Sequence, residues 1–411
     1  MVLASLKATP VTPPAANRFD LSEASLRALT NAKWNQYGPD VLPAFVAEMD
    51  FAVAEPIQNA VEAVVAKRDY GYPRRDGGKA GLAVANAFAH RMKDRFDWEI
   101  DPALVVPVAD LVQGTYAPVL AFTDPGDGII LQVPNYPPFR DVIRTTERNL
   151  IPLPMLDDGT RHICNTEQIV DQIDGRTRMF VLCNPHNPTG RVFSRQELLD
   201  IGRFCIEHDL IVLSDEIHSD LIYPGRKHIP FASLSPELAA RTVTLNSPTK
   251  SFNIPGLRCA VLHFGTPELR ERFGKRIPQR LLGDPNAIGV DATIAAWTQS
   301  QSWLDEVMAH LTATRDHVVK RLETELPEIR FRVPEGTYLA WLDCSALMLN
   351  TSAFDFFHDN ARVAFSPGEN FEPNGKAFVR FNFATSRVIA DQIIDRMVQS
   401  IRAIRRPERQ T

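Results

Sequence analysis

The sequence has few cysteines, and they show no paired spacing. Its 411 residues include five cysteines, at positions 164, 183, 205, 259 and 344. An odd number without any C-x-x-C pair argues against a disulfide framework or a structural zinc site, and it favours a reducing compartment. The ten histidines form no H-E-x-x-H pair, so we expect no metal in the site.

Long apolar runs and an excess of basic residues are also missing. No run of about 18 apolar residues occurs, and the N-terminus lacks the apolar core of a signal peptide. We therefore expect a cytoplasmic protein without a membrane partner. The formal net charge of −5 gives no electrostatic footprint for nucleic acid, so we expect no nucleic-acid partner.

No internal repeat or heptad pattern is present, which excludes a solenoid or a coiled coil. With 44% apolar and 23% charged residues, the composition is that of an ordinary globular protein. The length suits a large α/β domain with a smaller partner. We predict a flexible arm over 1–30, a segment packing with the small domain over 31–55, a large domain over 56–290 and a small α+β domain over 291–411.

Short apolar runs alternate with helical patterns in the predicted large domain. The clearest strands are predicted at 129–133, 179–183, 210–214 and 242–246, and their nearly continuous apolar character is typical of parallel strands covered on both faces. Ser194 and Glu197 form a capping box that predicts the start of a helix. This alternation of strands and helices indicates βαβ units and a mostly parallel central sheet flanked by helices. One long helical stretch is predicted at about 291–325, followed by strands near 331–344 and 376–384.

Polar clusters follow three of the predicted strands. They are N-P-H-N-P-T-G at 184–190, D-E-I-H at 215–218 and S-P-T-K at 247–250. In open α/β sheets, ligands bind beyond the carboxyl ends of the strands. These clusters are therefore the first candidates for a functional site.

Lys250 and Asp215 suggest a specific chemistry. An isolated lysine is usually a solvated surface residue, and an aspartate at a strand end is often only a cap or turn residue. Lys250, however, lies among hydroxyl-bearing residues, with Arg258 eight positions later. Such a set suits a phosphate dianion beside an amine nucleophile. A phosphorylated aldehyde cofactor needs this set, and it also needs a carboxylate at its pyridine nitrogen, for which Asp215 is well placed.

The three clusters, in this order, resemble the fold-type I pyridoxal 5'-phosphate (PLP) enzymes of the aminotransferase class I/II superfamily. The sequence is most similar to the branch of cystathionine β-lyases and other C-S lyases that includes MalY and PatB. The matching segments are LPAFVAEMDF (42–51), YGYPRR (70–75), PNYPPF (134–139), NPHNPTGRVF (184–193), SDEIHSDLIY (214–223), SPTKSFNIPGL (247–257) and VRFNFATSR (379–387). The resemblance spans about residues 30–400 and implies the aspartate aminotransferase-like fold, PLP as cofactor, and a homodimer with active sites at the subunit boundary.

The resemblance also implies residue roles. Lys250 would form the Schiff base and move protons, Asp215 would pair with the pyridinium nitrogen, and Tyr136 would stack on the ring. Arg380 would bind the substrate α-carboxylate. The implied cofactor-binding set is Gly114, Thr115, Tyr136, Asn187, Asp215, His218, Ser247, Lys250, Arg258 and, from the neighbouring subunit, Tyr72; the implied substrate-binding set is Arg380, Asn187 and Tyr72.

Some of these residues also have structural readings. His218 could be a structural histidine at a strand end, and Tyr72, between Gly71 and Pro73, could be a turn packing residue. Gly77-Gly78-Lys79 lacks the spacing of a phosphate loop, so we expect a turn leading into a helix. The chain also departs from the branch, with Glu48 where W-V-A-D-M-D-F is usual and Q-G-T-Y at 113–116 where P-G-V-V is common.

The resemblance favours β-elimination from a cysteine S-conjugate, such as cystathionine or a conjugate from specialised metabolism, with release of a thiol, pyruvate and ammonia. The same residues permit amino transfer. Decarboxylation or oxidative deamination in a biosynthetic pathway, for example on a thiosugar-cysteine conjugate, is a further alternative. A regulator that kept the fold without the chemistry is disfavoured, because such proteins carry a separate DNA-binding domain and the acidic balance opposes DNA binding.

Overall fold

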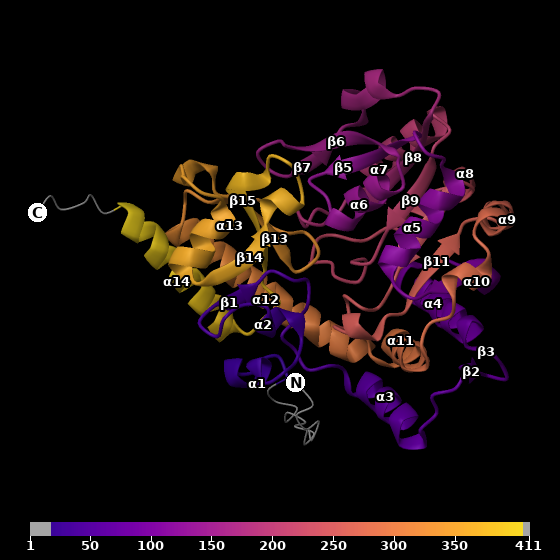
Figure 1. Ribbon diagram of the computed structural model, residues 1–411, viewed down its shortest axis with the longest axis horizontal. Coiled ribbons are helices and arrows are strands. Elements are labelled where there is room, and N and C mark those ends of the chain that lie inside the picture. The colour runs from indigo at the N-terminus through magenta and orange to yellow at the C-terminus, as the bar shows by residue number, and fades with distance from the viewer. Residues whose placement is uncertain (1–17, 406–411) are drawn as a thin grey trace, which may run out of the picture.

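The computed structural model describes residues 18–405 and contains two main sheets, each with its own helices (Figure 1). The larger sheet has eight strands. In sheet order these are β4 (Val105–Val108), β11 (Ala260–Phe264), β10 (Thr242–Asn246), β9 (Ile211–Asp215), β8 (Thr177–Cys183), β5 (Gly128–Val133), β6 (Asn149–Asp157) and β7 (His162–Cys164). Strands β10, β9, β8, β5 and β6 run parallel, whereas β11 and β7 are antiparallel to their neighbours. The predicted α/β class with a mostly parallel sheet is confirmed.

Alternate side chains of the central strands enter two different cores, as the two-residue period of a strand requires. On one face, Leu131 and Val181 pack with helices α5 (Leu111–Phe122), α6 (Pro137–Thr145) and α9 (Pro267–Arg276). On the other face, Ile130 and Phe180 pack with α7 (Arg195–Glu207) and α8 (Pro236–Ala239). Helices therefore cover both faces, which explains why these strands read as continuous apolar runs.

The smaller sheet lies toward the C-terminal half of the chain but takes one strand from the N-terminal part. Its order is β1 (Leu42–Ala44), β14 (Val363–Pro367), β15 (Phe378–Asn382), β13 (Leu339–Asp343) and β12 (Arg330–Phe331). Strand β1 pairs in parallel with β14. The associated helices are α12 (Gln301–Glu325), α13 (Ala353–Phe356) and α14 (Arg387–Arg405).

The remaining elements connect and border these two units. They are α1 (Glu23–Arg27), α2 (Ala32–Asn35), α3 (Glu55–Lys67), the hairpin β2 (Arg74–Arg75) and β3 (Gly78–Lys79), α4 (Ala80–Phe96), α10 (Gln279–Leu282) and α11 (Ala287–Gln299). The turn expected at 77–79 lies at 76–77, and β3 at Gly78–Lys79 leads directly into α4. Among residues 18–405, no helix has the length and apolarity needed to cross a bilayer.

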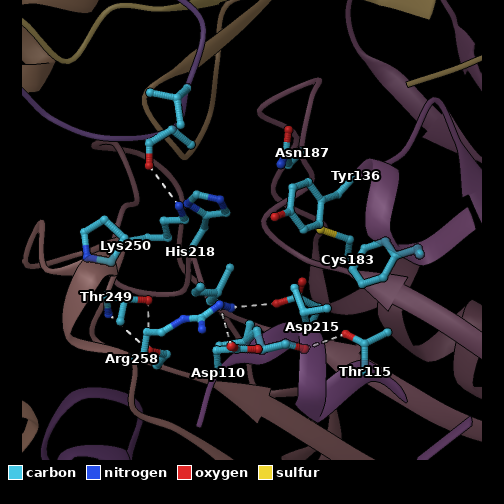
Figure 2. Close-up of a pocket in the computed structure, with 18 of the residues that line it drawn as sticks. Asp110, Thr115, Tyr136, Cys183, Asn187, Asp215, His218, Thr249, Lys250 and Arg258 are labelled. Atoms are coloured by element: carbon cyan, nitrogen blue, oxygen red, sulfur yellow. Dashed lines mark hydrogen bonds and ion pairs between the residues drawn. The ribbon is translucent and has the colours of Figure 1, made fainter. Parts of the chain in front are cut away.

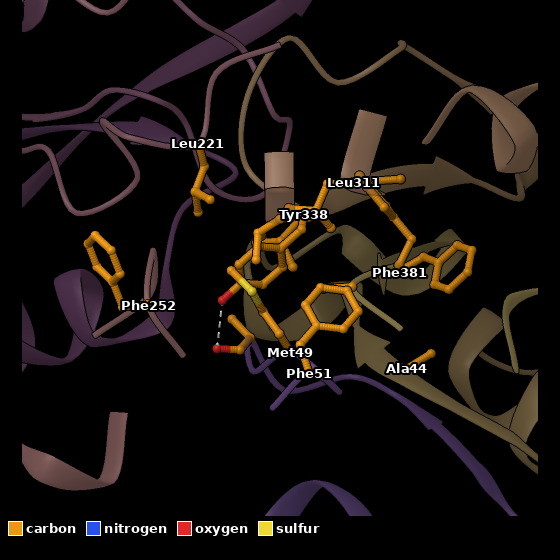
Figure 3. Close-up of a cluster of buried hydrophobic side chains, with 14 of the residues drawn as sticks. Ala44, Met49, Phe51, Leu221, Phe252, Leu311, Tyr338 and Phe381 are labelled. Atoms are coloured by element: carbon orange, nitrogen blue, oxygen red, sulfur yellow. Dashed lines mark hydrogen bonds between the residues drawn. The ribbon is translucent and has the colours of Figure 1, made fainter. Parts of the chain in front are cut away.

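Residues 45–51, which we call the connecting segment, lie where the two units meet and are held by side chains from both. Asn253, beyond β10, donates to the carbonyls of Met49 and Phe51, while Asn382 of β15 donates to the carbonyl of Glu48. Met49 and Phe51 belong to the buried cluster in Figure 3, together with Phe381 of β15 and Tyr338, which immediately precedes β13. The connecting segment therefore ties the small sheet to the edge of the large sheet.

Two sequence expectations need correction. Residues 1–17 of the predicted flexible arm lie outside the described residues, but residues 18–30 include α1, whose Leu26 is buried in the main core. The helix predicted at 291–325 is two helices, α11 and α12, interrupted at Ser300, whose hydroxyl donates to the carbonyl of Ala295. Helix α11 packs against α3 and α4 and crosses the predicted boundary at 290/291. The domain limits themselves stay predictions.

Candidate active site

A cavity of about 260 Å³ lies at the carboxyl ends of the central strands of the large sheet (Figure 2). It is formed by loops after β8, β9 and β10, by the start of α5, by β15 and by the connecting segment. Of the residues predicted from the sequence, nine line it: Thr115, Tyr136, Asn187, Asp215, His218, Ser247, Lys250, Arg258 and Arg380. The three polar clusters thus converge, as the parallel strands require.

Asp215 ends β9 at the centre of the sheet, where it pairs in register with Cys183 of β8 and Leu245 of β10. Its side chain is buried and accepts a hydrogen bond from the amide of Ile217 at 3.1 Å. Burial raises the pKa of Asp215 to about 7, because the charged form is desolvated. A cation placed beside this carboxylate would restore its charged form.

Lys250 follows β10 through the turn at 247–249, which Ser247 and Thr249 stabilise with their own hydrogen bonds. Its Nζ donates to the carbonyl of Ala47 in the connecting segment at 2.9 Å. Burial lowers the pKa of Lys250 to about 8. About a tenth of this amine is therefore neutral, and nucleophilic, at pH 7, which is far more than for a solvated lysine.

His218 lies on the loop after β9 and is 2% exposed. Burial lowers its pKa to about 3, so the ring is neutral. Its ring makes an edge contact with Tyr338, with ring centroids 6.0 Å apart. Its Nδ1 has no hydrogen-bond partner among residues 18–405. A buried ring nitrogen without a partner is suited to a hydrogen bond with a bound ligand.

Arg380 enters the cavity from the small sheet. It stands on β15 and is 5% exposed. Its guanidinium donates to Asn187 Oδ1 at 2.9 Å, to the carbonyl of Phe45 at 2.8 Å and to the hydroxyl of Ser366 at 3.0 Å. Burial lowers the pKa of Arg380 to about 10, so it remains cationic near neutral pH. No carboxylate within residues 18–405 pairs with it, which leaves its charge available to an anion.

Tyr136 borders the cavity at the start of α6 and is half-buried. Its ring packs edge-on against Phe139, with centroids 5.8 Å apart. Burial raises the pKa of Tyr136, so its hydroxyl stays protonated. In Figure 2 Tyr136 and Asn187 lie along one side of the cavity, while Arg258 and Asp110 lie along the other.

The start of α5 differs from the sequence prediction. Asp110 caps the helix, and its Oδ1 accepts a hydrogen bond from the amide of Gln113 at 2.9 Å. Gly114 donates its amide to the carbonyl of Asp110, and the Thr115 hydroxyl donates to the carbonyl of Leu111. Gly114 and Thr115 thus lie in the second turn with these groups used inside the helix. The amides facing outward are those of Leu111 and Val112, one turn earlier.

Arg258 completes that side of the cavity. It has a left-handed conformation, with φ of 47°, at the end of the loop after Lys250. Its guanidinium lies 3.1 Å from Asp110 Oδ2. The start of α11 packs closely behind this loop, because a Cβ on Gly289 would lie 2.3 Å from the carbonyl oxygen of Leu257. Ser247, by contrast, donates its hydroxyl to the carbonyl of Cys259.

Tyr72 does not reach the cavity of its own chain. It precedes the β2–β3 hairpin and is fully exposed. The sequence prediction assigned it to the cavity of a neighbouring subunit, so its role stays a prediction.

Sequence reasoning missed three groups that shape the site: Asp110, the carbonyl of Ala47, and Tyr338. The signal for Asp110 was present, because D-x-x-Q at 110–113 has the spacing of a helix cap, and the Gln113 side chain accepts a hydrogen bond from the Ala109 amide. Tyr338 donates its hydroxyl to Ala47 at 3.0 Å, the same carbonyl that accepts from Lys250. A backbone acceptor carries no sequence signal.

The residues present fit a phosphorylated pyridine aldehyde. The cavity offers a nucleophilic amine at Lys250, a buried carboxylate at Asp215, and an unpartnered ring nitrogen at His218. The N-terminus of α5 and the guanidinium of Arg258 lie on the same side of the cavity. Together they suit a phosphate. A metal would need different groups, and no cluster of three or more His, Cys, Asp or Glu residues suited to a metal occurs within 18–405.

Comparison with known proteins decides the family. The profile of the aminotransferase class I and II family matches residues 49–397. This chain belongs to that family. Its members are PLP-dependent enzymes, so the recognition and the cofactor predicted from the sequence are confirmed. The large and small sheets are those of the family fold.

Several individual relatives are similar to this chain over most of its length. The chain is 34% identical over 375 residues to the cystathionine β-lyase PatB of Bacillus subtilis, covering 90% of this chain and 95% of that protein. Among solved structures, OvoB is 35% identical with a TM-score of 0.85, covering 91% of this chain and 97% of that one. Cystalysin of Treponema denticola, solved with PLP, is 29% identical with a TM-score of 0.87, covering 93% and 98% of the two chains.

Proposed function

We propose that this enzyme is a PLP-dependent carbon-sulfur β-lyase that acts on a cysteine S-conjugate. The net reaction is that of the conjugate with one water, which gives a thiol, pyruvate and ammonia. The main support is the convergence of Lys250, Asp215 and Arg380 in one cavity of a chain whose relatives include cystathionine β-lyases.

Lys250 has two tasks in this proposal. Its neutral amine attaches the cofactor covalently, and the lowered pKa, about 8, favours this nucleophilic form. With PLP and substrate bound, the same atom would remove the proton from the substrate α-carbon. The Ala47 carbonyl, 2.9 Å from Nζ, accepts a hydrogen bond from the released amine and limits its movement.

Asp215 supports the electronic part of the reaction. When bound, PLP supplies an electron-withdrawing ring that stabilises negative charge at the substrate α-carbon. A protonated ring nitrogen is needed for this, and the buried carboxylate of Asp215 stabilises it as an ion pair. Because Asp215 is shielded from solvent, this interaction is stronger than it would be at the surface.

Arg380 orients the substrate. Its guanidinium offers the planar pair of donors that a carboxylate accepts, and Asn187 holds it from the large domain. A carboxylate held there would keep the substrate in the cavity that Lys250 also lines. The bond from the β-carbon to sulfur then breaks, its electron pair leaves with sulfur, and the thiolate takes up a proton.

Incubation of the purified protein with cystathionine or an S-alkyl cysteine provides the test. We expect pyruvate and free thiol in equal amounts, and neither product from the Lys250→Ala variant. 2-Aminobutyrate serves as a matched control, since it lacks a leaving group on the β-carbon. Absence of both products from every cysteine S-conjugate would contradict the proposal.

The same experiment separates the alternative reactions. Amino transfer would convert the cofactor to its pyridoxamine form, and a 2-oxo acid would reverse the change. Carbon dioxide release would indicate decarboxylation, and oxygen consumption would indicate oxidative deamination. Any of these as the main outcome would replace β-elimination.

We also propose a homodimer in the cytoplasm, with Tyr72 completing the partner's site. Tyr72 is fully exposed, and nearby Tyr70 is 65% exposed; two exposed aromatic residues in one short segment are typical of an interface. The cytoplasmic location is supported by the five cysteines, all of them free.

A mixed-subunit experiment tests the role of Tyr72. The Lys250→Ala homodimer should be inactive, and the Tyr72→Ala homodimer should be weakly active. Hybrids should regain activity, because one of their two sites then has both intact residues. Equal inactivity of the hybrids, or a monomeric protein in light scattering, would contradict the dimer proposal.

A further inference from the structure

Asp110 places a carboxylate at the end of the cavity where the cofactor's phosphate is expected. It is the cap of α5, the helix whose N-terminus faces the cavity, and both Asp110 and Leu111 line it. Its side chain is 25% exposed, so the charge is partly shielded from water. A capping aspartate stabilises its helix. In the proposed site, however, the cofactor's phosphate is a second anion that needs the same helix N-terminus.

The contacts of Asp110 occupy the same groups that would bind a phosphate. Its Oδ1 accepts from the amide of Gln113 at 2.9 Å, and its Oδ2 lies 3.1 Å from the Arg258 guanidinium. The Gln113 amide belongs to the same first turn of α5 as the outward-facing amides of Leu111 and Val112. Arg258 itself is 67% exposed and can turn toward either anion.

We propose that Asp110 weakens the enzyme's hold on the phosphate of its cofactor. Its fixed negative charge repels the dianion, and its ion pair with Arg258 competes for the cation that the phosphate needs. This inference rests on the proposed site, in which the phosphate binds beside α5 and Arg258. If Asp110 acts in this way, the enzyme holds its cofactor mainly through contacts with the ring and through Lys250, and less through the phosphate.

The substitution Asp110→Asn isolates the charge, because asparagine caps a helix as well as aspartate does. We compare the dissociation constants of PLP and of pyridoxal, which lacks the phosphate, by titrating each into cofactor-free protein. Absorption of the Lys250 adduct reports binding. The ratio of the two constants reports the phosphate's contribution alone.

For Asp110→Asn we expect affinity for PLP to rise on the order of 10-fold, as removal of one like charge at short range in a partly solvated site predicts. Affinity for pyridoxal should not change. Asp124→Asn is the matched control, since it removes another aspartate–arginine pair, with Arg276 at 2.6 Å, from an exposed site. It should leave both affinities unchanged.

An unchanged or lower PLP affinity in Asp110→Asn, with pyridoxal binding intact, would overturn the proposal and would mean that Asp110 orients Arg258 for the phosphate. An equal rise for both ligands would also overturn it, because the effect would not act on the phosphate. A wild-type protein that binds neither ligand at Lys250 would instead overturn the proposed function, and this inference with it.

Discussion

The two ends of the cavity differ in how they control charge. One end holds Asp215 and His218, and we call it the ring end because the cofactor ring is proposed to lie there. Both side chains are nearly buried, with 5% and 2% exposed, and burial shifts both pKa values in the direction that favours the neutral group. At the other end, the proposed phosphate end, Arg258 and Asp110 form an ion pair that water reaches, with exposed fractions of 67% and 25%. Charge is therefore set by burial at one end and by neighbouring charges at the other.

This difference predicts where substitutions should be costly. A buried charge without its partner is strongly unfavourable, whereas an exposed ion pair contributes little. The ring end should tolerate almost no change, while the phosphate end should tolerate substitution and respond to salt.

Asp215→Asn should have the largest effect. Asparagine keeps the shape but cannot stabilise a protonated ring nitrogen, so we expect kcat for β-elimination to fall on the order of 10²-fold or more. Cofactor attachment at Lys250 should persist and be visible by absorption. A variant with near wild-type kcat would show that the ring end does not depend on this carboxylate.

Arg380→Lys should lower kcat/KM by roughly 10- to 100-fold, which corresponds to the loss of one charge-assisted hydrogen bond. Lysine keeps the charge but not the planar pair of donors. Steady-state kinetics with the best cysteine conjugate give the value, and an unchanged KM together with an unchanged kcat would remove Arg380 from the substrate site.

The rate of cofactor attachment should rise with pH and level off near the pKa of Lys250. Burial disfavours the ammonium form and lowers this pKa to about 8. Between pH 6 and about 7 the neutral fraction should therefore rise nearly tenfold, and it should change little above about 9. A rate that keeps rising toward pH 10 would indicate an ordinary, solvated lysine.

Tyr338→Phe should have the smallest effect. It removes one hydrogen bond to Ala47 and should lower the free energy of unfolding by about 1 kcal/mol. The Ala47 carbonyl keeps its bond to Lys250, so cofactor attachment should continue. Denaturant unfolding measures the first effect, and a loss of attachment without a loss of stability would assign Tyr338 a direct role at the amine.

Much of the fold could be predicted because the central strands carry unbroken apolar runs and the capping box at Ser194 fixes the start of α7. The break between α11 and α12 was missed, although a polar run, T-Q-S-Q-S at 298–302, marks it in the sequence. The hydrogen bond from the Ser300 hydroxyl to the backbone at the break carries no sequence signal of its own. The flexible-arm prediction failed over residues 18–30, where Leu26 joins a core formed by distant segments.

The candidate site divides in the same way. Side chains at strand ends, such as Asp215 and Asn187, could be placed from the sequence because parallel strands end at one edge. The helix start that faces the cavity lies one turn before the predicted Gly114 and Thr115, whose roles at a phosphate stay predictions. The sequence prediction was based on the Gly114-Thr115 pair, whereas the cap at Asp110 fixes where α5 begins.

Borohydride reduction of the purified protein with PLP, followed by peptide mass analysis, tests the central claim most directly. The account predicts that reduction fixes the cofactor on Lys250 and on no other lysine, and that Lys250→Ala takes up none. A cofactor recovered on a different lysine, or an unmodified Lys250 in protein that still turns over cysteine conjugates, would contradict it.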